Sequence, residues 1–189
     1  MGLFTNYKKQ SDEQLMILIQ NGDHRAFSAI YDRYAKRLKS FFYRMLWSDE
    51  QMAEDSVQEV FTKLIEKPEL YNDQYAFVPW LFRIASNMCK NAYRKQQFEQ
   101  AFLAQLDTQQ VQLPKAEQML DEQLLMDSLH KTLAVMDEDK RELFLLRYQQ
   151  ELSIKELAQL FEISEGTVKS RLFYIKQQLA KSVKEDQIV

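Results

Sequence analysis

Apolar residues recur every three or four positions along most of the chain, and this pattern constrains the fold more than any other feature. Between residues 25 and 47 the recurring residues are Phe27, Ile30, Tyr34, Leu38, Phe41 and Met45. This is the spacing of one buried helical face. The 189 residues include only three Gly and three Pro, so few positions favour a tight turn. The sequence therefore predicts an all-α protein.

Capping residues and prolines indicate where the first helices begin and end. Ser11 opens a short first helix, and a later helix ends at Pro68. Pro79 stands in the first turn of a further helix, which is predicted to run to about Gln97. We expect these helices to form one small N-terminal domain over residues 1–97.

The middle of the chain differs from its flanks in charge. Residues 98–127 carry six acidic residues and one basic residue, whereas the net charge of the whole chain is only −3. The rest of the chain is therefore slightly basic. The helical period is also lost between residues 107 and 114. We therefore predict two small helical domains joined by an acidic linker, with the C-terminal domain over residues 128–189.

The C-terminal domain has the pattern of a helix-turn-helix. Ser153 and Glu156 have capping-box spacing, and Ser164 is a second N-cap candidate. The helix after Ser164 repeats apolar residues at steps of four, three and four, namely at Val168, Leu172, Ile175 and Leu179. One face of this helix is therefore predicted to be buried, and the opposite face is free to touch a ligand.

That opposite face and its edges carry hydroxyl, aromatic and cationic side chains, which suit base edges and phosphates in a major groove. The candidate DNA-reading residues are Thr167, Lys169, Ser170, Arg171, Phe173, Tyr174 and Lys176. The alternative is a solvated, lysine-rich helix in an α-bundle.

A second candidate surface lies in the N-terminal domain. No carboxylate occurs between Gln74 and Phe98. On a helix, four of the polar residues fall within a narrow arc: Arg83, Asn87, Lys90 and Arg94. Cations beside aromatic rings such as Trp80 can hold unpaired bases. The alternative is that these rings belong to the core.

A third candidate surface is acidic. Five acids lie between Ser48 and Phe61 with no Lys or Arg among them. Asp55, Gln58 and Glu59 lie away from the apolar side of the predicted helix, so they could meet a basic partner protein. A plain solvated acidic face is the alternative. A metal site is disfavoured because no His or Cys stands at ligand spacing.

Several classes of protein are disfavoured by what the chain lacks. With glycines only at positions 2, 22 and 166, no phosphate-cradling loop is predicted. The apolar runs are too short for a membrane span, and the lone Cys89 suits a reducing compartment. We expect a cytoplasmic protein that is not inserted in a membrane, is no enzyme, and needs no metal or cofactor.

Taken in order, four stretches resemble bacterial sigma factors of the extracytoplasmic-function (ECF) group. They are Ala26 to Leu46, Ala53 to Phe61, Trp80 to Asn87, and Gly166 to Leu172. The resemblance covers nearly the whole chain, and four motifs in the order of the family are more specific than any one of them.

The resemblance implies a protein that binds core RNA polymerase and directs promoter recognition and DNA melting. Asp55, Gln58 and Glu59 match the contact with the clamp helices of polymerase. The minus-ten element would be read by Trp80, Arg83, Asn87, Lys90, Asn91 and Arg94. The helix after Ser164 would read the minus-thirty-five element, and an anti-sigma factor is left open as a further partner.

Two residues depart from the family pattern. Many members carry an acid at the position of Asn91, and a basic residue often stands at the position of Tyr174. These departures concern the promoter sequence that is read. Two other functions remain open, a stand-alone helix-turn-helix regulator and a helical adaptor that does not touch DNA.

Overall fold

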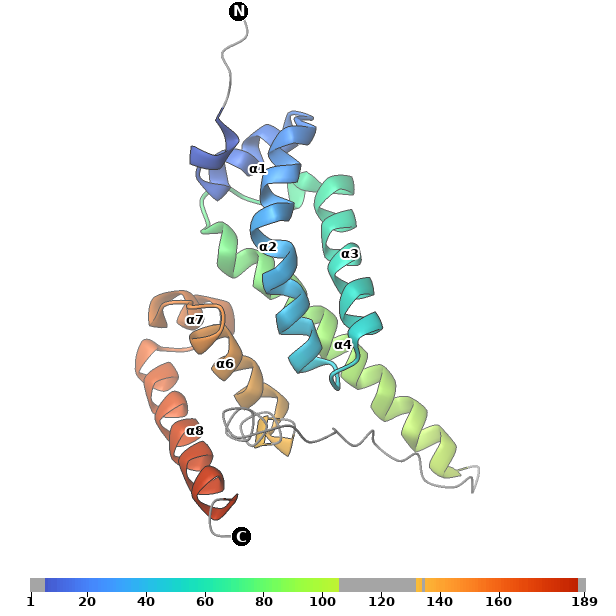
Figure 1. The fold of residues 1–189 in the computed structure, drawn as a ribbon, viewed down its shortest axis with the longest axis vertical. Helices are drawn as coiled ribbons and strands as arrows, with labels where there is room; N and C mark the ends of the chain where they lie inside the picture. The colour runs from blue at the N-terminus through green and yellow to red at the C-terminus, as the bar shows by residue number, and fades with distance from the viewer. Residues whose placement is uncertain (1–5, 106–131, 134, 187–189) are drawn as a thin grey trace, which may run out of the picture.

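The computed structural model describes residues 6–105, 132–133 and 135–186, and the regular structure within these ranges is entirely helical. The first group of helices is α1 (Asp12–Gln20), α2 (His24–Met45), α3 (Glu50–Glu66) and α4 (Phe77–Gln105). The second group is α6 (Glu138–Tyr148), α7 (Ile154–Phe161) and α8 (Glu165–Asp186). Short 3₁₀ turns cover Tyr7–Lys9 and Pro68–Leu70. Figure 1 shows the two groups side by side, which confirms the all-α prediction.

Side-chain caps set the starts of the N-terminal helices. Ser11 and Gln14 form the predicted capping box at α1, in which each side chain accepts a backbone N–H that the helix itself leaves unpaired. Asp23 and Asp49 accept backbone N–H groups at the starts of α2 and α3. Gly22, in the turn after α1, has φ of +86°, a conformation that glycine adopts without steric cost.

Helix α2 lies at the centre of the N-terminal domain and packs against α1, α3 and α4. Its apolar stripe meets rings from α4, and Phe41, Phe42, Phe77 and Phe82 are all fully buried. The rings of Phe41 and Phe82 meet edge to face, with centroids 5.5 Å apart, an arrangement that the ring quadrupoles favour. This core fixes which side of α4 faces outward.

The helix-turn-helix prediction is confirmed. Ser153 and Glu156 form a capping box at α7, and Glu162 ends α7 in the left-handed conformation with φ of 56°. The apolar residues of α8, Val168, Leu172, Ile175 and Leu179, are all buried. They pack with α6 and α7 to form the core of the C-terminal domain.

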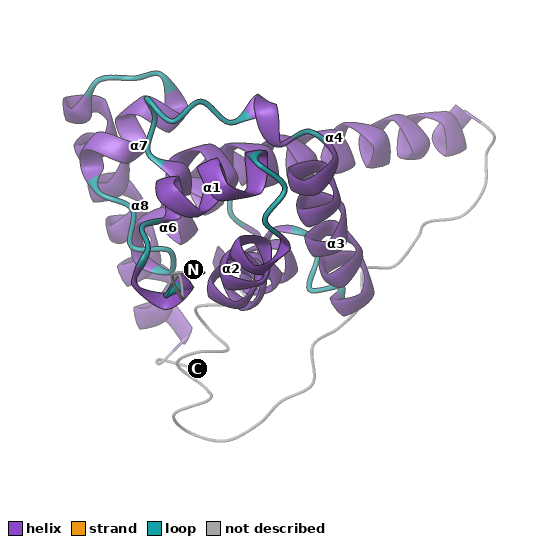
Figure 2. Ribbon diagram, turned by 90° about the horizontal axis from the view of Figure 1, so that it is seen from above, coloured by secondary structure: helices purple, strands orange, loops and turns teal. Residues whose placement is uncertain are grey.

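One helix boundary differs from the prediction. Helix α4 continues past Gln97 to Gln105, because residues 98–105 contain no helix breaker. Figure 2 shows the end of α4 projecting beyond the other helices. Helix α6 starts at Glu138, where the Asp137 side chain acts as its N-cap. Of the predicted acidic linker, residues 106–127 lie outside the described residues.

The two domains touch each other through α4 with α7 and through α2 with α6. Their buried apolar side chains form one connected cluster. The sequence pattern does not predict this contact, which brings α7 against the side of α4 that carries the candidate basic residues.

Candidate nucleic-acid interface

The acidic face on α3, formed by Asp55, Gln58 and Glu59, is exposed. The sequence suggested that the acids of this helix have no cation nearby, and the structure shows that they do. Lys39 of α2 donates to Glu50 at 2.8 Å and to Glu54 at 2.6 Å. The sequence gives no sign of this pairing, because Lys39 comes from the neighbouring helix.

Within the acidic face itself, pairing is local and exposed. Glu59 accepts from Lys63 at 2.6 Å, one turn along the same helix. Asp55 accepts from the Gln51 amide at 2.9 Å. Exposed ion pairs of this kind contribute little to stability, so both carboxylates can exchange their present partners for those of another protein.

The basic stripe, defined as Arg83, Asn87, Lys90 and Arg94, lies on one side of α4 as predicted. The opposite side is buried through Leu81, Ala85, Cys89 and Tyr93. Cys89 is fully buried, and burial raises the pKa of its thiol, which fits a core residue rather than a nucleophile. The core of the domain thus orients the stripe outward.

The aromatic residues around the stripe divide into core and surface. Phe77 and Phe82 are fully buried. Trp80 is half-buried, with its ring 5.0 Å from that of Tyr71. Tyr75 is 64 % exposed and is the ring most available next to Trp80, since both line one cleft between the domains. For Phe77 and Phe82, the interpretation as core rings was therefore the correct one.

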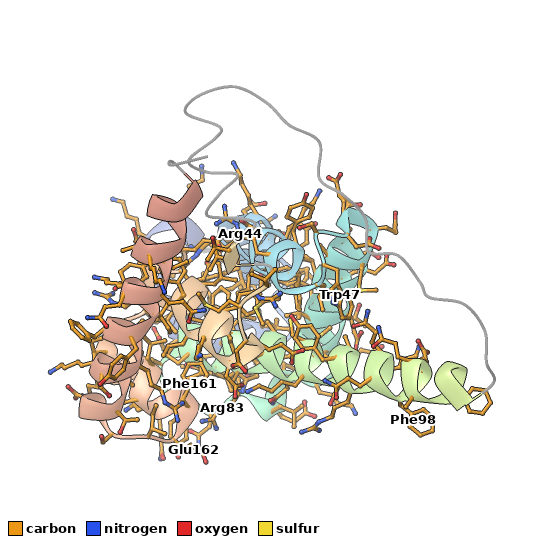
Figure 3. The ribbon with its side chains drawn as sticks, turned by 90° about the horizontal axis from the view of Figure 1, so that it is seen from below. Arg44, Trp47, Arg83, Phe98, Phe161 and Glu162 are labelled. Atoms are coloured by element: carbon orange, nitrogen blue, oxygen red, sulfur yellow. The ribbon has the colours of Figure 1, made fainter. Side chains whose placement is uncertain are left out.

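Two cations of the stripe are engaged by the C-terminal domain, as Figure 3 shows for Arg83 beside Phe161 and Glu162. Arg83 donates to the backbone carbonyls of Gln159 and Leu160 at 2.9 and 3.2 Å. Lys90 lies 3.4 Å from the Glu142 carboxylate. Asn87, Asn91 and Arg94 are exposed.

The outward face of α8 presents Lys169, Ser170 and Phe173, all exposed. The rings of Phe173 and Tyr174 are 57 % and 67 % exposed and meet edge to face, with centroids 5.7 Å apart. Exposed rings without a core to join are expected where a partner supplies the contact. This face therefore combines the Lys169 ammonium, the Ser170 hydroxyl and an aromatic pair.

The remaining predicted reading residues lie at the edges of this face, and two of them contact other residues of the C-terminal domain. Thr167 is half-buried and its N–H donates to the Ser164 hydroxyl at 3.0 Å, so it forms part of the N-cap of α8. The Lys176 ammonium lies 5.0 Å from the centre of the Tyr148 ring of α6. Arg171 is exposed and, together with Tyr174 of the outward face, lines a small hollow beside the start of α6. The seven residues thus lie on one helix, but their side chains do not all point the same way.

The described parts of the chain contain no group of three or more His, Cys, Asp and Glu side chains arranged to hold a metal ion. No helix within them is both long and apolar enough to cross a membrane.

Comparison with known families decides between the functions left open by the sequence. Residues 30–99 match the family described as Sigma-70 region 2, and residues 126–179 match the family described as Sigma-70, region 4. The chain belongs to the sigma-70 family, in its ECF group. The first match contains the acidic face and the basic stripe, and the second contains the helix-turn-helix, so this sigma factor carries both regions in their order.

Similar proteins span nearly the whole sigma factor. The RNA polymerase sigma-H factor of Pseudomonas aeruginosa is 27% identical over 186 residues, covering 93% of this chain and 95% of that protein. The ECF RNA polymerase sigma-E factor of Escherichia coli is 27% identical over 183 residues, covering 92% of this chain and 94% of that protein. The chain is a sigma factor that directs transcription initiation, which the comparisons favour over a stand-alone regulator.

Solved structures show the same fold. CnrH, in complex with the cytosolic domain of CnrY, superposes with a TM-score of 0.72 at 22% identity, over 94% of this sigma factor and 99% of that chain. The sigma factor RpoE of Bartonella quintana, in complex with the anti-sigma factor NepR, superposes with a TM-score of 0.67 at 24% identity, over 84% of this sigma factor and 96% of that chain.

Proposed function

We propose that the three surfaces divide the work of this sigma factor between its two domains. The acidic face binds core polymerase, the basic stripe with Trp80 handles the minus-ten element, and α8 reads the minus-thirty-five element. The observation that carries this assignment is that residues 30–99 and 126–179 match the two sigma-70 regions. The first range holds the acidic face and the stripe, and the second holds α8.

The acidic face suits a basic protein surface. Asp55, Gln58 and Glu59 project from a helix whose other side is anchored by Val57 and Val60, so their positions are fixed. Charge complementarity of this kind sets orientation and the rate of association. We assign this face to the clamp helices of core polymerase.

The basic stripe suits a single strand. Arg83, Lys90 and Arg94 are spaced along one side of α4, where they can follow a phosphate backbone. Asn87 lies among them and can hydrogen-bond the edge of an unpaired base, while Trp80 and Asn91 flank it. We assign these six residues to melting and holding the minus-ten element.

Helix α8 suits the major groove. We assign contacts with base edges to Ser170, Phe173 and Tyr174, and phosphate contacts to Lys169, Arg171 and Lys176. Thr167, whose N–H is capped by the Ser164 hydroxyl, is assigned to the first turn of the helix that faces the DNA. An aromatic ring on a reading helix pairs well with the methyl group of thymine.

The protein itself is proposed to be non-enzymatic and cofactor-free, since the chemistry of RNA synthesis belongs to polymerase. It acts in the cytoplasm, where core polymerase and promoter DNA are found. An anti-sigma factor is a proposed further partner, since the similar RpoE of Bartonella quintana is solved in complex with one.

The assignment is tested by run-off transcription with core polymerase on a promoter selected from a genomic library. Asn87→Ala should leave initial promoter binding in place and reduce DNA opening, measured by the reactivity of unpaired thymines. Lys169→Ala should reduce initial binding instead. If both variants fail at the same step, this division of labour is wrong.

Binding to core polymerase is tested separately. Asp55→Ala with Glu59→Ala should weaken the affinity for core by at least about tenfold, roughly 1.4 kcal/mol. Glu69→Ala, an exposed acid on the turn after α3, is the matched control and should keep the affinity. Equal affinities for all three proteins would remove the acidic face from the assignment.

A further inference from the structure

The first turn of α4 is capped from another helix. The Glu13 carboxylate of α1 accepts the backbone N–H of Phe77, the first residue of α4, at 3.1 Å. A helix cannot pair its own first N–H groups, and the preceding Ala76 has no side-chain oxygen that could accept one. A carboxylate also suits the positive end of the helix dipole. Glu13, 64 residues earlier in the chain, therefore acts as the cap that the local sequence lacks.

A second side chain of α1 holds the other end of the α3–α4 loop, defined as residues 67–76. The Gln20 side-chain amide donates to the backbone carbonyls of Pro68 and Tyr71, both at 3.0 Å. The amide nitrogen carries two hydrogens, so one side chain fixes both carbonyls relative to each other. With Gln20 near the start of the loop and Glu13 just past its end, α1 bridges the loop.

Between these two anchors, the loop is packed against the ring of Trp80. Tyr71 is 3 % exposed, and its hydroxyl donates to the backbone carbonyl of Tyr75 at 2.6 Å. The ring of Tyr71 lies 5.0 Å from that of Trp80 and 5.7 Å from that of Phe77. The positions of Tyr75 and Trp80 therefore depend on the path of the loop, and that path is held by α1.

Helix α1 lies outside the stretch that matches Sigma-70 region 2, since α1 is Asp12–Gln20 and the match covers residues 30–99. The buried side of α1 joins the core of the domain, and this packing holds the helix in place. Glu13 is half-buried and Gln20 is exposed, so their hydrogen bonds add little to the stability of the whole domain. What they fix is the local path of the α3–α4 loop.

We propose that Glu13 and Gln20 are positioning residues for the minus-ten surface. They hold the α3–α4 loop so that the ring of Trp80, with Tyr75 beside it, is already in place when the strand separates. This inference rests on the proposed role of Trp80 and the basic stripe. A ring that is fixed beforehand avoids the entropy cost of ordering it on binding, so the two residues favour DNA opening rather than the first encounter with the promoter.

Two variants of Glu13 test the cap in the holoenzyme, on a promoter found by run-off transcription. DNA opening, measured by the reactivity of unpaired thymines, should fall about fivefold in Glu13→Ala, the factor that corresponds to the roughly 1 kcal/mol cost of a lost helix cap. Glu13→Gln keeps an acceptor oxygen and should retain most of the opening. Core affinity and initial promoter binding should not change. Equal loss of opening in both variants, or loss of all three activities together, would overturn the proposal.

Gln20→Ala removes both donors at the other end of the loop and should also reduce opening. The matched controls are Glu69→Ala, an exposed acid on the turn Pro68–Leu70, and Gln100→Ala, an exposed glutamine near the end of α4. Both controls should open DNA as the original chain does. Amide hydrogen exchange should be faster in the α3–α4 loop of Glu13→Ala and Gln20→Ala than in that of the controls. Unchanged exchange in this loop would overturn the proposal.

A double-mutant cycle separates this proposal from the role of Trp80. Trp80→Ala alone should reduce opening, and adding Glu13→Ala to it should cost little more, because Glu13 acts through the position of that ring. If Trp80→Ala has no effect on opening, the assignment of Trp80 fails and the proposal fails with it. If Trp80→Ala reduces opening but Glu13→Ala costs the same factor with and without the ring, only the positioning role is refuted.

Discussion

At the scale of single residues, the structure separates side chains that share a chemical type. Phe77, Phe82 and Phe173 are all phenylalanines on helices, yet the first two are fully buried and the third is 57 % exposed. Tyr174, which departs from the family pattern, lies next to Phe173 with its ring 67 % exposed. On the helix that we propose to read the major groove, an exposed aromatic pair favours recognition of an apolar group.

We predict that Phe173 contacts a thymine methyl group in the minus-thirty-five element. Replacing thymine by deoxyuridine removes only the methyl, and at the contacted position this should weaken binding of the holoenzyme about three- to tenfold. In Phe173→Ala the same replacement should have no further effect. Tyr174→Ala and Tyr174→Phe tell which ring makes the contact.

The readout is holoenzyme affinity in a double-mutant cycle of protein and base. If the cost of deoxyuridine at every thymine of the element is the same for Phe173→Ala, Tyr174→Ala and the original protein, neither ring reads a methyl group.

At the scale of helices, the first turn of α8 contains a glycine that the fold does not require. A methyl group added at Gly166 would lie 3.6 Å from the Ser164 hydroxyl, an ordinary contact distance, and Gly166 is not among the residues with positive φ. Glycine disfavours helix formation relative to alanine. Its presence at the start of the helix that we propose to read DNA favours close approach by another molecule.

We predict that Gly166→Ala separates stability from function. The substitution should raise the free energy of unfolding by about 0.4–1 kcal/mol, because it restricts the unfolded chain without strain. It should also weaken use of the minus-thirty-five element if the DNA backbone approaches this turn. Urea denaturation and run-off transcription measure the two effects, and a variant that is more stable and fully active would exclude the close approach.

At the scale of the whole molecule, buried charge lies where the two domains meet. Glu142 is 1 % exposed and Arg141 is 7 % exposed. Arg141 donates to the Met136 carbonyl at 3.0 Å, and Glu142 has Lys90 as its counter-ion. Burial raises the pKa of the Glu142 carboxyl, and contacts with Ser86 and Lys90 partly oppose the rise.

We predict that the difference in stability between Glu142→Gln and the original chain depends on pH. Because the pKa of the Glu142 carboxyl is higher in the folded chain, the folded state binds the proton more tightly than the unfolded state does. Stability is therefore lost as the pH rises from the ordinary carboxyl value of 4.5 through the raised one. Glu142→Gln removes this titration, so its stability relative to the original chain should increase with pH over that window.

Urea denaturation of both proteins between pH 4.5 and 7.5 measures this difference. A difference that stays constant or decreases with rising pH would show that ionisation of Glu142 does not destabilise the protein.

The sequence alone determined the helices, most of their caps and the direction of their outward faces. Periodicity and capping act over a few residues, so the sequence shows them directly, as at Ser11, at Ser153 and in the apolar residues of α8. Only the tertiary structure decided what each face meets. Lys39 pairs with acids of the next helix, and Arg83 donates to carbonyls 76 and 77 residues away. A backbone carbonyl has no signature in the sequence, and contacts at such separation depend on how the two domains dock.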